Sequence, residues 1–148
     1  MHGSVSTIRL TSIARDHARA AVRRQQFSIG APLEFDAASP RVAALEYALG
    51  AVGGEVLNGF RAFASRRRLA IDAIEAVVTG ELENPLAYLE VIGEPRETRI
   101  AAIRITLFVA APDEAALRTM FDEMVDRLPL VCTLRGATRL HIELIFTD

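Results

Sequence analysis

Cys132 is the only thiol in this 148-residue chain, and it is the first side chain to consider for chemistry. A single cysteine excludes an intramolecular disulfide and any metal site built from several cysteines. If residues 128–134 form a helix, Cys132 lies one turn after Leu128, and the guanidinium of Arg135 would favour the reactive thiolate. Free cysteines are more often buried and inert, so a structural role is the simpler interpretation.

Two glutamates, Glu46 and Glu55, are the next candidates because they stand in a long apolar segment with few other polar side chains. Glu55 follows Val52 by three residues and therefore shares a helical face with it. A buried carboxylate must pair, take up a proton or reach water, because an unpartnered buried charge is too costly. Both glutamates are candidates for lining a pocket, where such a group could bind the polar end of a ligand. The simpler interpretation is a salt bridge to an arginine, within the chain or across a dimer.

The histidine spacing, the net charge and the lengths of the apolar runs exclude several classes of function. The three histidines, His2, His17 and His141, have no ligand-like spacing, so no metal or cofactor is expected. A net charge of −2 gives no general attraction to nucleic acid, and no apolar run reaches the roughly 18 residues that span a bilayer. The first residues lack a secretory signal pattern. We expect one cytoplasmic domain over residues 1–148, with no nucleic-acid or membrane partner.

The hydrophobic pattern predicts the elements that would position these side chains. Strand-like sequence covers residues 6–13 and 18–29, and Ser39 before Pro40 is typical of a helix start. That helix should extend to about Arg67, and because it is apolar on nearly every side it should be buried in a core. Alternation predicts strands over 74–82 and 103–109, an amphipathic helix over about 114–128 and a last strand over 140–146. The order is β-β-α-β-β-α-β, an α+β fold.

Glycines inside the predicted long helix need a compensating contact. Each costs about 1 kcal/mol relative to alanine in a helix interior. The usual reason for keeping them is the close approach of another backbone or of a bound ligand. The glycines concerned are Gly50, Gly53, Gly54 and Gly59.

Two segments resemble the signature sequences of the OsmC/Ohr family, the osmotically inducible and organic-hydroperoxide-resistance proteins. Residues 48–52 read Ala-Leu-Gly-Ala-Val, where the family has an Ala-Leu-Gly-Ser-Cys type of run. Residues 128–136 read Leu-Pro-Leu-Val-Cys-Thr-Leu-Arg-Gly, where the family has a Cys-Pro-Val-Ser-x-Thr-Leu-Arg-Gly type of run. Val52 and Leu128 stand at the places of the two family cysteines. The expected order of elements is similar to that of the family over essentially the whole chain.

The resemblance implies an intertwined homodimer with its active sites at the subunit interface. In the family, a helix-borne thiolate attacks the O–O bond of an organic hydroperoxide, and the second cysteine captures the sulfenic acid as a disulfide. An arginine and a glutamate from the N-terminal half assist the first cysteine. Arg15 and Arg19 lie in a segment that loosely resembles the family's arginine run. At the usual place of the family glutamate this chain has residues 42–44, none of which is acidic, and Glu46 lies about a turn beyond that place. The alternative for both arginines is an exposed charge at a strand end.

Three hypotheses for the function follow. The preferred one is a non-redox homodimer that binds a small apolar ligand in an interfacial pocket, because aliphatic side chains replace both cysteines. The second is an organic hydroperoxide reductase, a thiol peroxidase that uses Cys132 alone with an external thiol. The third is a structural or regulatory protein without a ligand, which a core with no cavity between Val52 and Leu128 would favour.

Overall fold

The computed structural model describes residues 3–148, which form two compact units, one ending at Ala48 and the other beginning at Leu49. His2 therefore lies outside the described residues, and the single domain over residues 1–148 stays a prediction. The chain has an α+β fold, as the hydrophobic pattern predicted. The order of elements is richer than predicted, because it contains one more strand and one more helix than β-β-α-β-β-α-β.

The first unit is built on a three-stranded antiparallel sheet, β1 (Arg9–Ala14), β2 (His17–Val22) and β3 (Gln25–Ile29), in that spatial order. The prediction of one long strand over residues 18–29 was wrong. The chain instead turns at Arg23, whose φ of 53° lies in the left-handed region, so that β3 folds back on β2. A non-glycine residue seldom adopts this φ, and the sequence offers no glycine to mark the turn.

The long helix α1 (Ala44–Arg66) starts four residues later than predicted. Ser39 and Pro40 belong to the preceding loop, where the Ser39 hydroxyl accepts a hydrogen bond from the Arg41 amide at 3.4 Å. The buried residues of α1 recur every three or four positions on one side: Val52, Gly53, Val56, Phe60 and Ala64. The prediction of a helix buried on every side was therefore wrong for the single chain.

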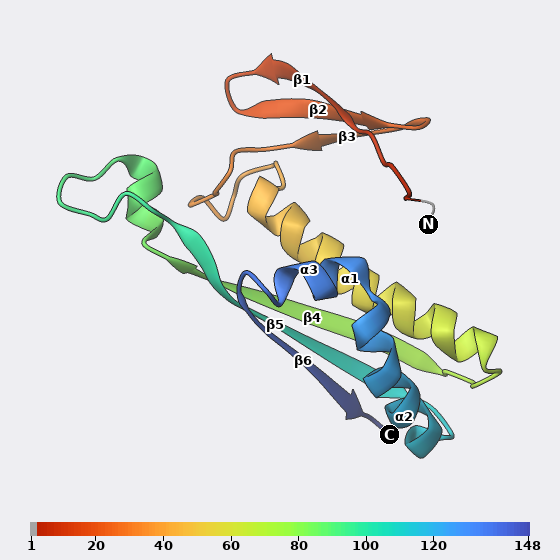
Figure 1. Ribbon diagram of the computed structural model, residues 1–148. Helices are drawn as coiled ribbons and strands as arrows, with labels where there is room; N and C mark the ends of the chain where they lie inside the picture. Colours follow the sequence, from red (N-terminus) through yellow and green to blue (C-terminus); the bar gives the residue numbers. More distant parts are fainter. Residues whose placement is uncertain (1–2) are drawn as a thin grey trace. The chain divides into compact units, whose positions relative to one another are not determined.

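The second unit contains the sheet β4-β5-β6, with β5 in the centre. The strands β4 (Ala73–Glu83) and β5 (Arg99–Ala110) are antiparallel, and β6 (Arg139–Phe146) runs parallel to β5. The 84–98 arm, which joins β4 to β5, contains a short 3-10 helix (Pro85–Leu89). Figure 1 shows α1, α2 (Glu114–Met124) and α3 (Pro129–Leu134) on the same face of this sheet.

The predicted helix over 114–128 is interrupted. The structure has α2, a 3-10 turn (Val125–Arg127) and then α3, which begins after Leu128. Asp113 caps α2, since its side chain accepts a hydrogen bond from the Ala116 amide at 3.1 Å. Pro129 is the first residue of α3, a position where the missing N–H of proline loses no helical bond.

One hydrophobic core holds the second unit together. It lies between the helices and the inner face of the sheet, where alternate residues of β5 are fully or almost fully buried: Ile103, Ile105, Leu107 and Val109. The residues between them, such as Arg104, point to the opposite face, which no helix covers (Figure 1). Among residues 3–148, no helix is long and apolar enough to cross a membrane.

Candidate functional site

Val52 and Leu128, the two residues that the sequence resemblance puts at the family cysteine positions, are part of the packed core. Val52 is 0% exposed and Leu128 is 5% exposed, and both belong to the same hydrophobic cluster. A Cβ added to Gly59 would approach Leu128 Cδ2 to 2.9 Å, which shows how closely α1 and Leu128 pack. The neighbour of Gly59 is thus the Leu128 side chain, rather than the backbone or ligand that the sequence predicted.

The other helix glycines divide into two kinds. A Cβ on Gly53 would come within 2.3 Å of Val78 Cγ2, so Gly53 lets α1 lie directly against β4. Around Gly50 and Gly54 there is nothing within 4 Å of the added Cβ. A contact within this chain therefore accounts for Gly53 but not for Gly50 or Gly54.

Glu55 caps the N-terminus of α3 from a distance. Its two carboxylate oxygens accept hydrogen bonds from the Leu130 and Val131 amides, each at 3.0 Å. Leu128 at the N-cap has no side-chain oxygen, Pro129 has no N–H, and the Cys132 amide donates to the Leu128 carbonyl at 2.9 Å. All the otherwise unpartnered donors of the first turn are thus satisfied, two of them by Glu55 alone.

Glu46 caps its own helix. Its carboxylate accepts a hydrogen bond from the Ala43 amide at 2.7 Å, and Glu46 is the third residue of α1. This is one half of a capping box, with Ala43 in place of the usual hydroxyl residue. Within residues 3–148 neither Glu46 nor Glu55 forms an ion pair. Their role in lining a pocket stays a prediction.

Cys132 is exposed, on the surface of α3. Its sulfur lies 3.4 Å from the Asp126 carbonyl oxygen and 3.9 Å from that of Val125. Arg135 is bound nearby, since it donates to the Asp126 carboxylate at 2.8 Å and to the Val125 carbonyl at 3.2 Å. Residues 128–134 do contain a helix, yet Leu128 faces the core while Cys132 faces outward. A catalytic role for Cys132 stays a prediction.

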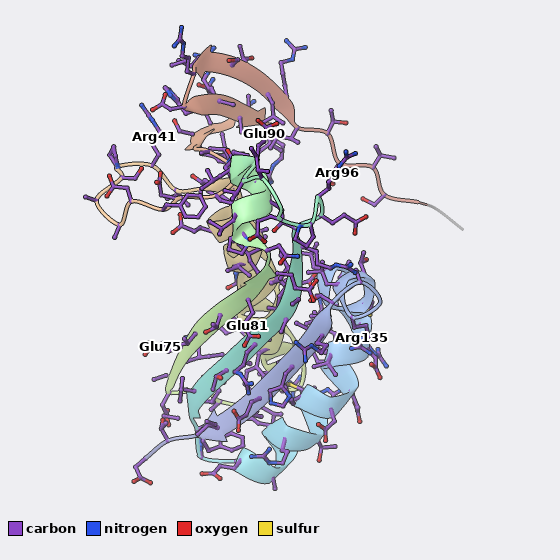
Figure 2. The ribbon with its side chains drawn as sticks, turned by 90° about the vertical axis from the view of Figure 1, so that its left-hand side faces the viewer. Arg41, Glu75, Glu81, Glu90, Arg96 and Arg135 are labelled. Atoms are coloured by element: carbon purple, nitrogen blue, oxygen red, sulfur yellow. The ribbon has the colours of Figure 1, made fainter. Side chains whose placement is uncertain are left out.

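Arg15 and Arg19 are exposed in the first unit, Arg15 in the turn after β1 and Arg19 on β2. Sequence reasoning missed the polar cluster beside them. Asp16 accepts hydrogen bonds from His17 Nδ1 at 2.9 Å and from Arg41 Nε at 3.2 Å, and Figure 2 labels Arg41. These contacts, the one with His17 first, lower the pKa of the Asp16 carboxyl below its ordinary value of 3.8. The cluster ties the β1–β2 turn to the loop before α1.

The surface depressions with the best-formed walls have volumes of about 360 to 550 Å³, and none of these is lined by Val52, Leu128, Glu55 or Cys132. One of about 550 Å³ lies on the face of β4-β5-β6 that the helices leave open, and it is lined by residues of all three strands, among them Arg104, Arg139 and His141. In the part of the chain that the structure describes, no group of three or more His, Cys, Asp or Glu side chains could hold a metal ion.

Solved structures share this architecture at low sequence identity. A hypothetical protein from Aquifex aeolicus VF5 superposes with a TM-score of 0.77 at 12% identity, and the match covers 98% of each chain. An OsmC-like protein from Mycoplasma pneumoniae also gives 0.77 at 15% identity, over 99% of this chain and 98% of that one. The organic hydroperoxide resistance protein OhrB of Bacillus subtilis gives 0.62 at 14% identity, over 95% and 98%. No protein-family model and no curated protein matches the sequence.

Proposed function

We infer that this chain, which has the fold of the OsmC and Ohr proteins, is a non-redox cytoplasmic protein that acts as a homodimer and binds a small apolar molecule at the subunit interface. The observation that carries the non-redox part is the burial of two aliphatic side chains, Val52 and Leu128, where the resemblance puts the two cysteines. Neither side chain has an ionisable atom. A thiolate, a sulfenic acid and a disulfide are all impossible at these two positions.

Exposed apolar surface supports the homodimer. The 84–98 arm carries five exposed apolar residues within a short stretch: Leu86, Tyr88, Leu89, Val91 and Ile92. Ile92 is fully exposed. The outward side of α1 is also poor in charge, with Gly50, Ala51 and Ala62 open to solvent. Exposed apolar side chains gathered in this way are typical of a protein–protein interface, and a second copy of the chain would cover them.

The packing of the core leads us to propose that the ligand lies elsewhere than between the two former cysteine positions. Val52 and Leu128 are already in contact with other core side chains, so a small molecule would lie against the outward side of α1, near Ala51. The open space at Gly50 and Gly54 supports this position. Apolar contact is what that surface offers, because no charged residue lies on α1 between Glu46 and Glu55.

Light scattering after size exclusion tests the homodimer. Ala51→Arg adds a charge to the outward side of α1, whereas the control Thr119→Arg adds the same charge to an exposed position of α2. We expect the wild type and Thr119→Arg to be dimers and Ala51→Arg to be largely monomeric at micromolar concentration. A monomeric wild type, or a dimer unaffected by Ala51→Arg, would contradict the proposed interface.

Ligand-observed NMR with cumyl alcohol tests the apolar site. Saturation transfer to the aromatic protons is expected with the wild type and with Thr119→Arg, and it should disappear with Ala51→Arg. The second candidate, a structural or regulatory protein without a ligand, is favoured by the close packing around Val52 and Leu128. No saturation transfer with the wild-type dimer would support that candidate.

The organic hydroperoxide reductase remains a candidate on one observation, the exposure of Cys132. A peroxidatic thiol must be accessible, and this one is. It must also be stabilised as the thiolate, and Arg135 is instead bound to Asp126 and Val125. Hydroperoxide consumption by the wild type and by Cys132→Ser tests this alternative.

A further inference from the structure

The open face of β4-β5-β6 carries a row of three polar side chains with hydrogen-bond donors. Strand pairing puts Thr79 opposite Arg104 and Arg104 opposite His141. Since neighbouring strands lie about 4.8 Å apart, the three side chains span roughly 10 Å across the sheet. Arg139 stands two residues before His141 on β6 and so lies on the same face. These four residues line the depression of about 550 Å³.

The two arginines of this depression have no anionic partner among residues 3–148. Neither Arg104 nor Arg139 takes part in an ion pair, and His141 forms none either. Arg139 donates only to the backbone carbonyl of Ala101, at 3.4 Å. By contrast, Arg99 at the beginning of β5 is paired with Glu83 at 3.1 Å. Two arginines that line one depression and form no ion pair in the described chain are suited to an oxyanion from outside the chain.

Two acidic side chains border the depression. Glu81 lines it from β4, where Figure 2 labels it together with Glu75, and Glu143 follows His141 by two residues on β6. Neither pairs with Arg104 or Arg139. When it is ionised, the Glu81 carboxylate can accept hydrogen bonds but cannot donate them. It therefore suits a hydroxyl or amino group of a ligand rather than its anionic end.

We propose that this depression binds a small polar molecule that carries an oxyanion, a phosphate or a carboxylate, through Arg104 and Arg139, with Thr79 and His141 as further donors. Glu81 would accept a hydrogen bond from a hydroxyl or amino group next to the oxyanion. The site goes beyond the proposed function, because Arg104 and the core residues Ile103 and Ile105 point to opposite faces of β5. It requires no second copy of the chain.

Titration of the His141 ring signal by NMR tests the proposal. Inorganic phosphate and malonate are added separately at constant pH and ionic strength, with sodium chloride as the reference salt. We expect a saturable shift of the His141 Cε1–H signal with phosphate or malonate and not with chloride. The anion that binds more tightly, phosphate or malonate, shows whether the site prefers a phosphate or a carboxylate.

Matched variants distinguish a site from general salt effects. Arg104→Gln and Arg139→Gln should each weaken binding at least about tenfold, because each removes charge-assisted hydrogen bonds. The control Arg24→Gln, in the exposed turn between β2 and β3, should leave binding unchanged. All three variants should keep the thermal midpoint of the wild type.

Two results would overturn the proposal: no saturable shift with either anion, or the same affinity in Arg104→Gln and Arg139→Gln as in the wild type. The outcome is separate from the proposed homodimer, because Ala51→Arg lies on α1 and should bind the anion as the wild type does. A monomeric wild type that binds the anion would contradict only the interface, and a dimeric wild type that shows no saturable shift would contradict only this site.

Discussion

Replacing Glu55 with alanine should destabilise the protein by about 2–3 kcal/mol, although the side chain has no ion-pair partner in the described chain. The carboxylate satisfies the Leu130 and Val131 amides at the start of α3. The Leu130 amide is near solvent, so water can replace the bond and the loss should be about 1 kcal/mol. The Val131 side chain is fully buried and its amide is partly buried, so its loss should reach about 2 kcal/mol.

Thermal unfolding followed by circular dichroism measures this effect. For a chain of this length, 2–3 kcal/mol corresponds to a fall in Tm of about 5–10 °C. Glu55→Gln should lie between the wild type and Glu55→Ala, because the amide keeps one acceptor oxygen and turns an N–H toward the other donor. The matched control is Glu123→Ala, which removes an exposed ion pair with Arg67 and should cost less than about 1 kcal/mol.

Amide hydrogen exchange shows where in the chain the stability is lost. The Leu130 and Val131 amides should exchange faster in Glu55→Ala, while amides in the centre of β5 should change only as much as the global stability does. A Tm for Glu55→Ala within 1 °C of the wild type, or unchanged exchange at Leu130 and Val131, would refute the account of Glu55 as the cap of α3.

Three further predictions concern separate parts of the chain. Stability should fall as the pH drops below about 3.8 through the lowered pKa of Asp16, because the unfolded state then binds a proton that the folded state does not; Asp16→Asn should flatten this part of a urea-unfolding pH profile. Val52→Cys should leave one thiol that reacts quickly with Ellman's reagent, Cys132, and a second that reacts only after unfolding in guanidinium, since position 52 is 0% exposed; rapid reaction of both would contradict the packing. Gly53→Ala should cost about 1–3 kcal/mol in chemical denaturation, because its Cβ would meet Val78 at 2.3 Å; a gain in stability would mean that α1 does not lie against β4 at this point.

The fold could be predicted because two short segments and the hydrophobic pattern agree with each other. Alternation placed β4, β5 and β6 within a few residues of their observed ends, and the end of α1 was predicted to within one residue. Such patterns report burial on one face of an element, which is local information. That Val52 and Leu128 replace two cysteines stays a prediction from the sequence, and the structure adds that both side chains are buried.

What the sequence could not predict depends on contacts between distant residues. The start of α3 has no local cap, because Glu55 supplies it from 75 residues earlier in the chain. The start of α1 was misplaced because Ser39 and Pro40 carry the usual signal, whereas the cap that forms is the bond from the Ala43 amide to Glu46. The turn at Arg23 has no glycine or asparagine to mark it.

The partners of the charged side chains could not be predicted from the neighbouring sequence either. Glu46 and Glu55 were candidates to line a pocket or to pair with an arginine. In the described chain both carboxylates accept hydrogen bonds from backbone amides and neither forms an ion pair, and their role in lining a pocket stays a prediction. The register of the three strands β4, β5 and β6 brings together the side chains that form no ion pair in the described chain, Arg104, Arg139 and His141. Of these strands, β5 and β6 are separated in sequence by α2 and α3. Neither arrangement can be read from residue spacing alone.

The central claim is that this OsmC-like fold acts without thiol peroxidase chemistry. The most direct test is the consumption of cumene hydroperoxide with dithiothreitol or a lipoylated reductant, measured for the wild type and for Cys132→Ser. The account predicts no turnover above the protein-free rate in either protein. Wild-type turnover that disappears in Cys132→Ser would contradict it and would establish Cys132 as a peroxidatic thiol.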